Sequence, residues 1–196
     1  MSAHMFDPEW RPSVHIAGPA RRERVGQRVG RTDSPLTDHG REEARSIAAA
    51  VAETAFTHAF ASPLQRAWET AGLVGLTPTV DDLLVEWDYG DYEGITTDAT
   101  RQIIPDWSVW THDIVNSESV DEVGRRADAA IDRYSGLSGP IAVLAHGHFL
   151  RIFAARWLGL PAQEGRRFVL NTSTLSLLGW ERENRMIKRW NDPCGW

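Results

Sequence analysis

The segment Gly139–Arg151, with the sequence GPIAVLAHGHFLR, says most about how this chain folds. Within it, Ile141–Ala145 is continuous and aliphatic, and Gly139-Pro140 bounds it, which is the pattern of a buried strand. His146-Gly147 ends that strand, and residues 149–158 then favour a helix. A buried strand that runs almost directly into a helix is typical of α/β domains.

The rest of the chain repeats this alternation of strand and helix. Further strands are predicted at residues 13–17 and 58–61, with a closing antiparallel pair at 175–180 and 185–190. Further helices are predicted at 37–54, 62–73, 97–104 and 119–134. Three of these helices have N-cap signals, at Thr37, at Ser62 with Pro63 as the first helical residue, and at Ser119 with Glu122 in a capping box.

This order of elements predicts a three-layer α/β/α domain with a mainly parallel sheet. In such sheets the ligand lies beyond the carboxyl ends of the strands. Candidate functional residues are therefore sought just after Ala17, Ala61 and Ala145.

Length and composition favour one cytoplasmic domain. A chain of 196 residues suits a single domain, and 42% hydrophobic residues can form a substantial core. The net charge of −6 argues against nucleic-acid binding, and no apolar segment is long enough to span a membrane. The single cysteine, Cys194, fits a reducing compartment. We expect an N-terminal extension at 1–12, in part a cloning remnant, and a domain at 13–196 with a lid insertion at about 95–118.

Two residues that follow predicted strands are able to bind an anion. Arg66 lies in the first turn of the helix after Ala61, and a guanidinium at a helix N-terminus suits phosphate or carboxylate. His146 follows the buried strand and can donate a hydrogen bond or a proton to an anionic group. Spacing alone favours the interpretation of Arg66 as a solvated surface arginine. His146 reads equally as a structural histidine that ties down a loop.

A third candidate, Glu86, lies in the aromatic segment that precedes the expected lid. A carboxylate beside Trp87 would be partly desolvated, and desolvation favours the protonated form that a general acid needs. The alternative is an ordinary loop acid, because this stretch contains several. The spacing of His146 and His148 suggests a metal ligand pair, but no matching cysteine, histidine or carboxylate cluster accompanies it, so no metal is expected. No cofactor motif is present either.

Five motifs, in order along the chain, resemble those of one family. They are GRTDSPLT at 30–37 with Gly40, SPLQRAWETA at 62–71, EWDYGDYEG at 86–94, Glu118-Ser119, and HGHFLR at 146–151. Each is weak alone, and together they resemble the histidine phosphatase superfamily, which includes cofactor-dependent phosphoglycerate mutase. The resemblance covers about residues 14–180. It implies a phosphoglycerate-mutase-like fold and a phosphate pocket.

The resemblance also implies roles for individual residues. Arg66 would be a phosphate-binding arginine, Glu86 the proton donor and His146 the histidine beside the phosphate. The family's first strand ends in Arg-His-Gly-Glu-Thr, where the histidine is the nucleophile. An ungapped alignment places that arginine at Ile16 and that nucleophile at Ala17, and only Gly18 matches.

The departure at residues 16 and 17 closes the family's covalent route, because an alanine methyl cannot carry a phosphoryl group. Losing one arginine also weakens the preference for a dianion, although Arg22 in the following loop is a candidate to restore the charge. Trp87 is a candidate for stacking against a ligand. The ligand is expected to be a small anionic molecule, and a homodimer is compatible with the sequence.

Three functional interpretations remain open. In the first, the pocket is repurposed, and Glu86 and His146 perform acid–base chemistry on a group other than a phosphomonoester. In the second, the protein is a pseudophosphatase that binds an anionic ligand or a partner protein without turnover. In the third, it is a phosphomonoesterase that uses His15, two residues before Ala17 on the same side of the strand.

Overall fold

The computed structural model describes residues 13–18 and 27–193. Within them a six-stranded sheet has the strand order β3-β2-β4-β1-β5-β6. Its strands are β1 (Val14–Ala17), β2 (His58–Ala61), β3 (Thr79–Val80), β4 (Ile141–Leu144), β5 (Leu175–Glu181) and β6 (Asn184–Asp192). The first four strands in this order pair in parallel, whereas β5 runs antiparallel to both β1 and β6. The mainly parallel sheet with a closing antiparallel pair is thus confirmed.

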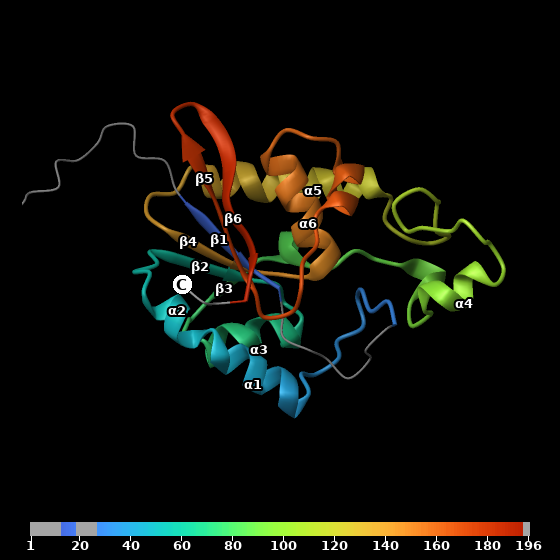
Figure 1. Cartoon of the computed structure of the whole chain (residues 1–196), viewed down its shortest axis with the longest axis horizontal. Coiled ribbons are helices and arrows are strands. Elements are labelled where there is room, and N and C mark those ends of the chain that lie inside the picture. The colour runs from blue at the N-terminus through green and yellow to red at the C-terminus, as the bar shows by residue number, and fades with distance from the viewer. Residues whose placement is uncertain (1–12, 19–26, 194–196) are drawn as a thin grey trace, which may run out of the picture.

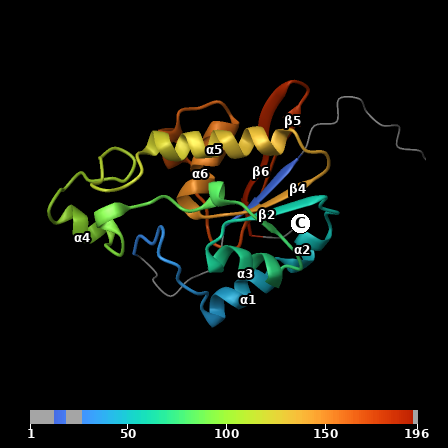
Figure 2. The same ribbon diagram turned by 180° about the vertical axis from the view of Figure 1, so that it is seen from behind.

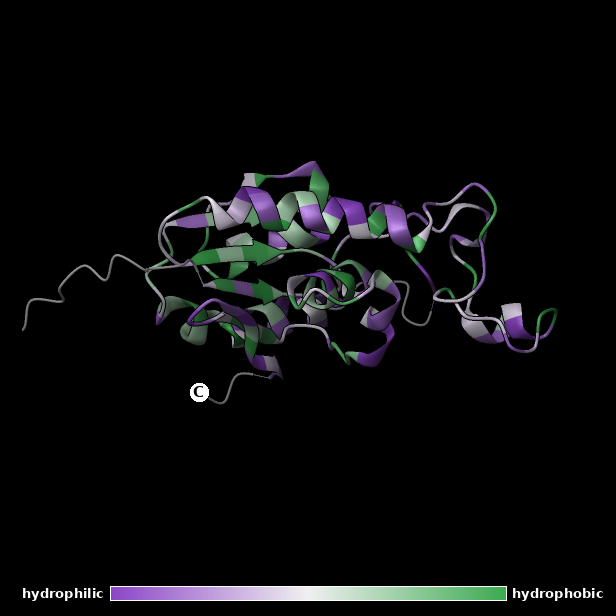
Figure 3. Ribbon diagram, turned by 90° about the horizontal axis from the view of Figure 1, so that it is seen from above, coloured by the Kyte–Doolittle hydropathy of each residue, from purple (hydrophilic) through white to green (hydrophobic). Residues whose placement is uncertain are grey.

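Helices cover both faces of this sheet (Figure 1). One face carries α1 (Asp38–Ser46), α2 (Ala48–Ala52) and α3 (Gln65–Leu73), and the other carries α5 (Val120–Ser135) and α6 (Gly147–Trp157). Figure 3 shows the same layers coloured by hydropathy, with apolar strands inside and polar residues on the outer side of α5. The three-layer α/β/α architecture is confirmed.

The core divides between the two faces because successive residues of a strand point to opposite sides of the sheet. Ile16 packs, with no exposed surface, in the cluster that includes α5 and α6. Ala17 packs in the other cluster, with Leu144 from β4 and Val51 from α2. Residues 16 and 17 therefore contribute apolar packing to two separate cores.

Several predicted helix boundaries were wrong, and the helix expected at 97–104 ends at Arg101. The helix expected at 37–54 is broken at Ile47, which ends α1 and begins α2, so the periodic apolar stripe spans two short helices. Helix α3 begins at Gln65 with Leu64 as its N-cap, not at Ser62. The Ser62 hydroxyl accepts from the amide of Leu64 at 3.3 Å and also bonds His146 beyond the sheet edge. The capping box of Ser119 and Glu122 at the start of α5 is confirmed.

Residues 95–118 extend past the end of the sheet and include the short helix α4 (Thr97–Arg101) (Figure 2). Arg28 fastens α4 to the preceding loop. Its guanidinium donates to the hydroxyl oxygens of Thr97 at 3.0 Å and Thr100 at 2.6 Å, and lies 4.2 Å from the centroid of the Trp107 ring. Within the described ranges no helix has the length and apolar character needed to cross a membrane.

Candidate functional site

Strand register brings three chain segments together at the carboxyl edge of the sheet. Leu144 of β4 lies beside Ala17 of β1 on one side and beside Ala61 of β2 on the other. The residues that follow continue this alignment, because the Ala145 amide donates to the Ala17 carbonyl and the Ser62 amide donates to the Leu144 carbonyl. The segments that begin at residues 18, 62 and 145 therefore start side by side.

His146 lies at the centre of this edge and is the N-cap residue of α6. Its ring is 1% exposed and has a partner at each nitrogen. Arg66 Nε donates to Nδ1 at 3.2 Å, and Nε2 lies 2.7 Å from Ser62 Oγ. Since an arginine nitrogen can only donate, Nδ1 accepts, and in the neutral ring the proton lies on Nε2 and is donated to Ser62.

Arg66 is 1% exposed, so its interpretation as a solvated surface residue is wrong. Besides His146, its guanidinium donates to the carbonyl oxygens of Thr32 and Gly30, each at 2.9 Å. These contacts join α3 to the GRTDSPLT segment. The arginine is thus a buried cation whose hydrogen bonds connect three parts of the site.

Glu86 is also buried, at 5% exposure, and it fixes the start of α6. Its carboxylate accepts from the amides of Trp87 at 2.9 Å, Phe149 at 2.9 Å and His148 at 3.2 Å. The last two donors belong to the first turn of α6, where backbone amides lack partners within the helix. Arg126 holds the backbone that leads into Glu86, donating to the carbonyls of Leu83 at 2.7 Å and Val85 at 2.9 Å.

The opposite side of the edge, which we call the β1 side, is formed by Ile16, Ala17 and Gly18. The first two are buried and apolar, as described above. Gly18 is also buried, and a Cβ atom there would lie 3.3 Å from the Asn171 carbonyl oxygen. We call Ser62, Arg66, Glu86 and His146 the polar side.

His15, the alternative nucleophile, lies in β1 two residues before Ala17 and so further from this edge. Its Nε2 is 3.4 Å from Ser13 Oγ, and its ring meets Phe56 edge-on at 4.9 Å between centroids. None of the contacts described for His15 involves the polar side. Burial lowers the pKa of His15 from 6.5 to about 4, so the imidazole is neutral at neutral pH.

The remaining sequence candidates differ in position. Trp87 is 1% exposed and donates from Nε1 to the Glu118 carbonyl at 2.8 Å. It is therefore a buried packing residue next to Glu86, and its ring is not exposed for stacking against a ligand. Arg22 lies outside the described residues. Sequence reasoning missed the Ser62 hydroxyl, which it had assigned to a helix cap, and the pairing of His148 with Tyr89 at 2.6 Å.

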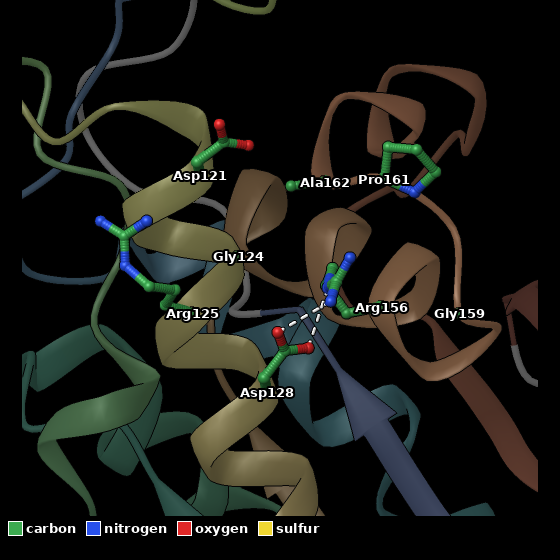
Figure 4. Close-up of a pocket in the computed structure, with 8 residues that line it drawn as sticks. All are labelled: Asp121, Gly124, Arg125, Asp128, Arg156, Gly159, Pro161 and Ala162. Carbon is green, nitrogen blue, oxygen red and sulfur yellow. Dashed lines mark hydrogen bonds and ion pairs between the residues drawn. The ribbon is translucent and has the colours of Figure 1, made fainter.

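One hollow of about 400 Å³ lies elsewhere, between α5 and the segment that follows α6 (Figure 4). Figure 4 shows Arg156 turned toward Asp128, with which it forms two hydrogen bonds at 2.8 and 2.9 Å. These charges satisfy each other, and no polar-side residue lines the hollow. Across the described part of the chain, no group of three or more His, Cys, Asp or Glu side chains is placed to hold a metal ion.

Comparison with known proteins identifies the relatives of this chain. The family model "Histidine phosphatase superfamily (branch 1)" matches residues 18–193. An acid phosphatase of Mycobacterium tuberculosis is 39% identical over 170 residues, which is 83% of each chain. Sedoheptulose 1,7-bisphosphatase of Saccharomyces cerevisiae is 35% identical over 177 residues, covering 71% of this chain and 64% of the yeast protein.

Solved structures agree with this relationship. The product of the open reading frame Rv3214 from Mycobacterium tuberculosis superposes with a TM-score of 0.83 at 36% identity, covering 94% of this chain and 98% of that one. An Escherichia coli protein described as a putative alpha-ribazole-5'-P phosphatase has the same TM-score at 23% identity, covering 93% of this chain and 97% of its own. At that identity the second likeness concerns the fold.

Proposed function

Since this chain belongs to the histidine phosphatase superfamily, we propose that it keeps the family's anion pocket but works there without a phosphohistidine. In this proposal a small anionic molecule binds at the carboxyl edge of the sheet. Arg66 provides positive charge, and Glu86 and His146 perform acid–base chemistry on a group other than a phosphomonoester. The chain is then a repurposed enzyme of the superfamily.

The observation that carries this proposal is the position of Ala17. It is the last residue of β1, in register with Leu144 two residues before His146. A nucleophile on β1 that attacks a group bound near His146 would be expected at this strand end. An alanine there has no atom that can attack phosphorus or hold a phosphoryl group.

The polar side supports binding of an anion. Arg66 and His146 are hydrogen-bonded to each other, so the arginine's charge and the imidazole lie next to one another inside a buried site. Electrostatic interactions are strengthened where water is excluded. In the neutral ring described above Nε2 carries the hydrogen, so it can donate to a ligand atom that replaces Ser62. For His146 to take up a proton, its Nδ1 must also give up the hydrogen bond from Arg66.

A second candidate function is binding without turnover, and the internal hydrogen bonds of the polar side favour it. Glu86 already accepts from three backbone amides, and both ring nitrogens of His146 have protein partners. A pseudophosphatase would retain these residues because they hold α3, α6 and the sheet together. It would bind an anionic ligand or a partner protein and release it unchanged.

The third candidate, a phosphomonoesterase that uses His15, has one favourable feature. The low pKa keeps the His15 imidazole neutral, which is the nucleophilic form. Against it, the ring packs on Phe56 and lies about 6–7 Å back along the strand from residue 17, by the rise of a β-strand. The nucleophile would have to leave this packing to reach a ligand at the sheet edge.

A phosphatase assay over a panel of phosphomonoesters tests the proposal. The proteins compared are the natural protein, Ala17→His, Ala17→His combined with Ile16→Arg, and His15→Ala. We expect negligible hydrolysis by the natural protein and a gain in at least one of the two variants that contain Ala17→His. The single substitution is included because Ile16 has no exposed surface, and an arginine there strains the core.

The outcomes separate the three candidates. Robust turnover by the natural protein that disappears in His15→Ala would establish the His15 phosphatase and overturn the proposal. If the natural protein is inert toward phosphomonoesters, a screen of other anionic metabolites follows, with substrate loss as the readout. Ligands that raise the melting temperature but are recovered unchanged, with no member of the panel consumed, would favour the pseudophosphatase.

A further inference from the structure

The orientation of Arg66 depends on a loop that lies outside the helix carrying it. Its guanidinium donates to the carbonyl oxygens of Gly30 and Thr32, each at 2.9 Å. A further hydrogen bond runs from Nε to His146 Nδ1 at 3.2 Å. Because a guanidinium is planar and its N–H groups have fixed directions, these acceptors set the plane in which it lies. Whatever fixes the two carbonyls therefore also fixes Arg66.

The same two loop residues are held by a carboxylate from a distant part of the chain. The amide of Gly30 donates to both carboxylate oxygens of Glu93, at 3.0 Å each, and the amide of Thr32 donates to Oε1 at 3.1 Å. Hydrogen bonds from backbone amides to a carboxylate are charge-assisted, and so stronger than those between neutral groups. Glu93 thus binds the N–H groups of the two residues whose carbonyls accept from Arg66.

The loop lies directly against the segment that contains Glu93. Gly30 is buried, and a Cβ atom at this position would lie 2.1 Å from the carbonyl oxygen of Trp87 and 3.1 Å from Glu93 Oε2. Glycine, which has no side chain, is the residue that permits this close approach of one backbone to another. The loop therefore rests on the backbone at residue 87, and the hydrogen bonds to Glu93 keep it there.

The loop is also attached to the helix that carries Arg66. The amide of Gln65, the first residue of α3, donates to Asp33 Oδ1 at 2.8 Å. This attachment does not involve Glu93. Loss of the Glu93 carboxylate would therefore loosen the loop at residues 30–32 without detaching it from α3.

We propose that Glu93 is a positioning residue of the anion pocket, which orients Arg66 by holding the loop whose carbonyls accept its hydrogen bonds. Glu93 acts through Gly30 and Thr32, and no contact with the ligand is assigned to it. The inference deepens the proposed function and rests on it for the effect on anion binding. The orientation of Arg66 itself can be measured whether or not an anion binds.

The Nε–H group of Arg66 is the direct reporter of this orientation. Its NMR signal in the full chain is assigned with Arg66→Lys, which has no such group, and its exchange with water is followed in each variant. Glu93→Gln keeps one acceptor oxygen but replaces the other with an NH₂ group, which cannot accept from a backbone amide. We expect the signal to shift and to exchange about tenfold faster or more, as for the loss of a hydrogen bond to a charged group.

Two control variants separate positioning from a general loss of stability. Glu42→Gln removes an exposed carboxylate on α1, 74% accessible, and should leave the Arg66 signal unchanged. Ile131→Val leaves a small cavity at a core position of α5 that is 1% exposed, which lowers stability, and it should also leave the signal unchanged. If Ile131→Val and Glu93→Gln move the signal equally, the effect is a general loosening and the inference is wrong.

Anion binding is measured in the same proteins with sulfate, which mimics a tetrahedral phosphoryl group. We expect Glu93→Gln to bind sulfate about tenfold more weakly than the natural protein, and the two controls to bind it equally well. If Glu93→Gln binds sulfate as tightly as the natural protein does, or leaves the Arg66 signal in place, the inference is wrong while the pocket stands. If neither sulfate nor inorganic phosphate binds the natural protein, the pocket proposal is wrong, and with it the role of Glu93 in anion binding.

A measurement on the natural protein keeps the test valid should Glu93→Gln fail to fold. Hydrogen exchange is followed for the amides of Gly30 and Thr32 and for the Nε–H group of Arg66. If Glu93 holds Arg66 through the loop, one local opening exposes all of these hydrogens, and we expect protection of the same order for each. Much stronger protection of the arginine hydrogen would show that Arg66 stays in place when the loop opens, which would contradict the inference.

Discussion

The polar side and the β1 side face the same edge of the sheet but differ in what their buried residues do. On the polar side, Arg66, Glu86 and His146 are buried and hydrogen-bonded to protein partners. On the β1 side, Ile16 and Ala17 are equally buried but contribute only apolar packing. Among the described residues, the polar side therefore forms a hydrogen-bonded network, whereas the β1 side packs through apolar atoms.

The polar side and the β1 side therefore differ in what a substitution would disturb, which is hydrogen bonding in the first and apolar packing in the second. The polar groups connect α3, α6 and the GRTDSPLT loop, so removing one takes a hydrogen bond away from each of its partners. A side chain at the end of β1 has no such structural duty, and alanine fits there without leaving any partner unpaired. A change of side chain at the end of β1 is therefore expected to cost less stability than a change among the polar groups.

The largest effect expected on stability is from Arg66→Met. The change removes the Arg66 donor from the carbonyls of Gly30 and Thr32 and from Nδ1 of His146, although the Thr32 carbonyl keeps the Ser34 amide at 3.1 Å. We expect a loss of about 3 kcal/mol or more in the free energy of unfolding, measured by urea denaturation. Arg125→Met is the control, since the Arg125 side chain is 69% exposed. Equal effects of the two changes would show that the polar side has no structural role.

In strand β1, the low pKa of His15 predicts how the stability of the protein varies with pH. Its pKa is about 4 in the folded protein and 6.5 when unperturbed, so the unfolded state binds more protons between these values. The free energy of unfolding should therefore fall as pH drops from about 6.5 to 4, by up to roughly 3 kcal/mol from this group. Denaturation of the natural protein and of His15→Leu at a series of pH values measures how much of this fall is due to His15. If the free energy of unfolding varies with pH in parallel in the two proteins, the prediction is wrong.

A smaller effect on the free energy of unfolding is expected from Glu86→Gln. The amide retains one acceptor oxygen but turns an NH₂ group toward backbone donors at the start of α6. We expect a loss of about 1–3 kcal/mol in the free energy of unfolding. Glu183→Gln, in the exposed turn between β5 and β6, is the matched control and should change it by less than about 0.5 kcal/mol. If Glu86→Gln leaves the free energy of unfolding unchanged, this carboxylate does not anchor the start of α6.

Much of the fold was predictable because its signals are local. The aliphatic run at Ile141–Ala145 and the capping box at Ser119 each identify an element from a few adjacent residues, and both elements form. Helices α1 and α2 were merged because an apolar stripe does not reveal a one-residue break such as Ile47. Short β3 (Thr79–Val80) has too few residues to show a pattern.

The site was predicted less completely, because its contacts join distant parts of the chain. Sequence order indicated that Arg66, Glu86 and His146 follow strands or lie near them, but it could not show that Arg66 bonds His146 or that Glu86 binds the start of α6. The Ser62 hydroxyl was assigned to a local cap, the commoner use of serine before a helix, and it does accept from the Leu64 amide at 3.3 Å. Its second partner, His146, lies 84 residues away and has no local signal. The pairing of Tyr89 with His148 likewise has no local signal.

The central claim is that the site works without a phosphohistidine, and phosphoenzyme trapping tests it most directly. The natural protein and Ala17→His are mixed with an isotopically labelled phosphomonoester and denatured rapidly, and the label attached to protein is counted. We predict none on the natural protein and acid-labile label on Ala17→His. Acid-labile label on the natural protein, lost in His15→Ala, would contradict the account and make His15 the nucleophile.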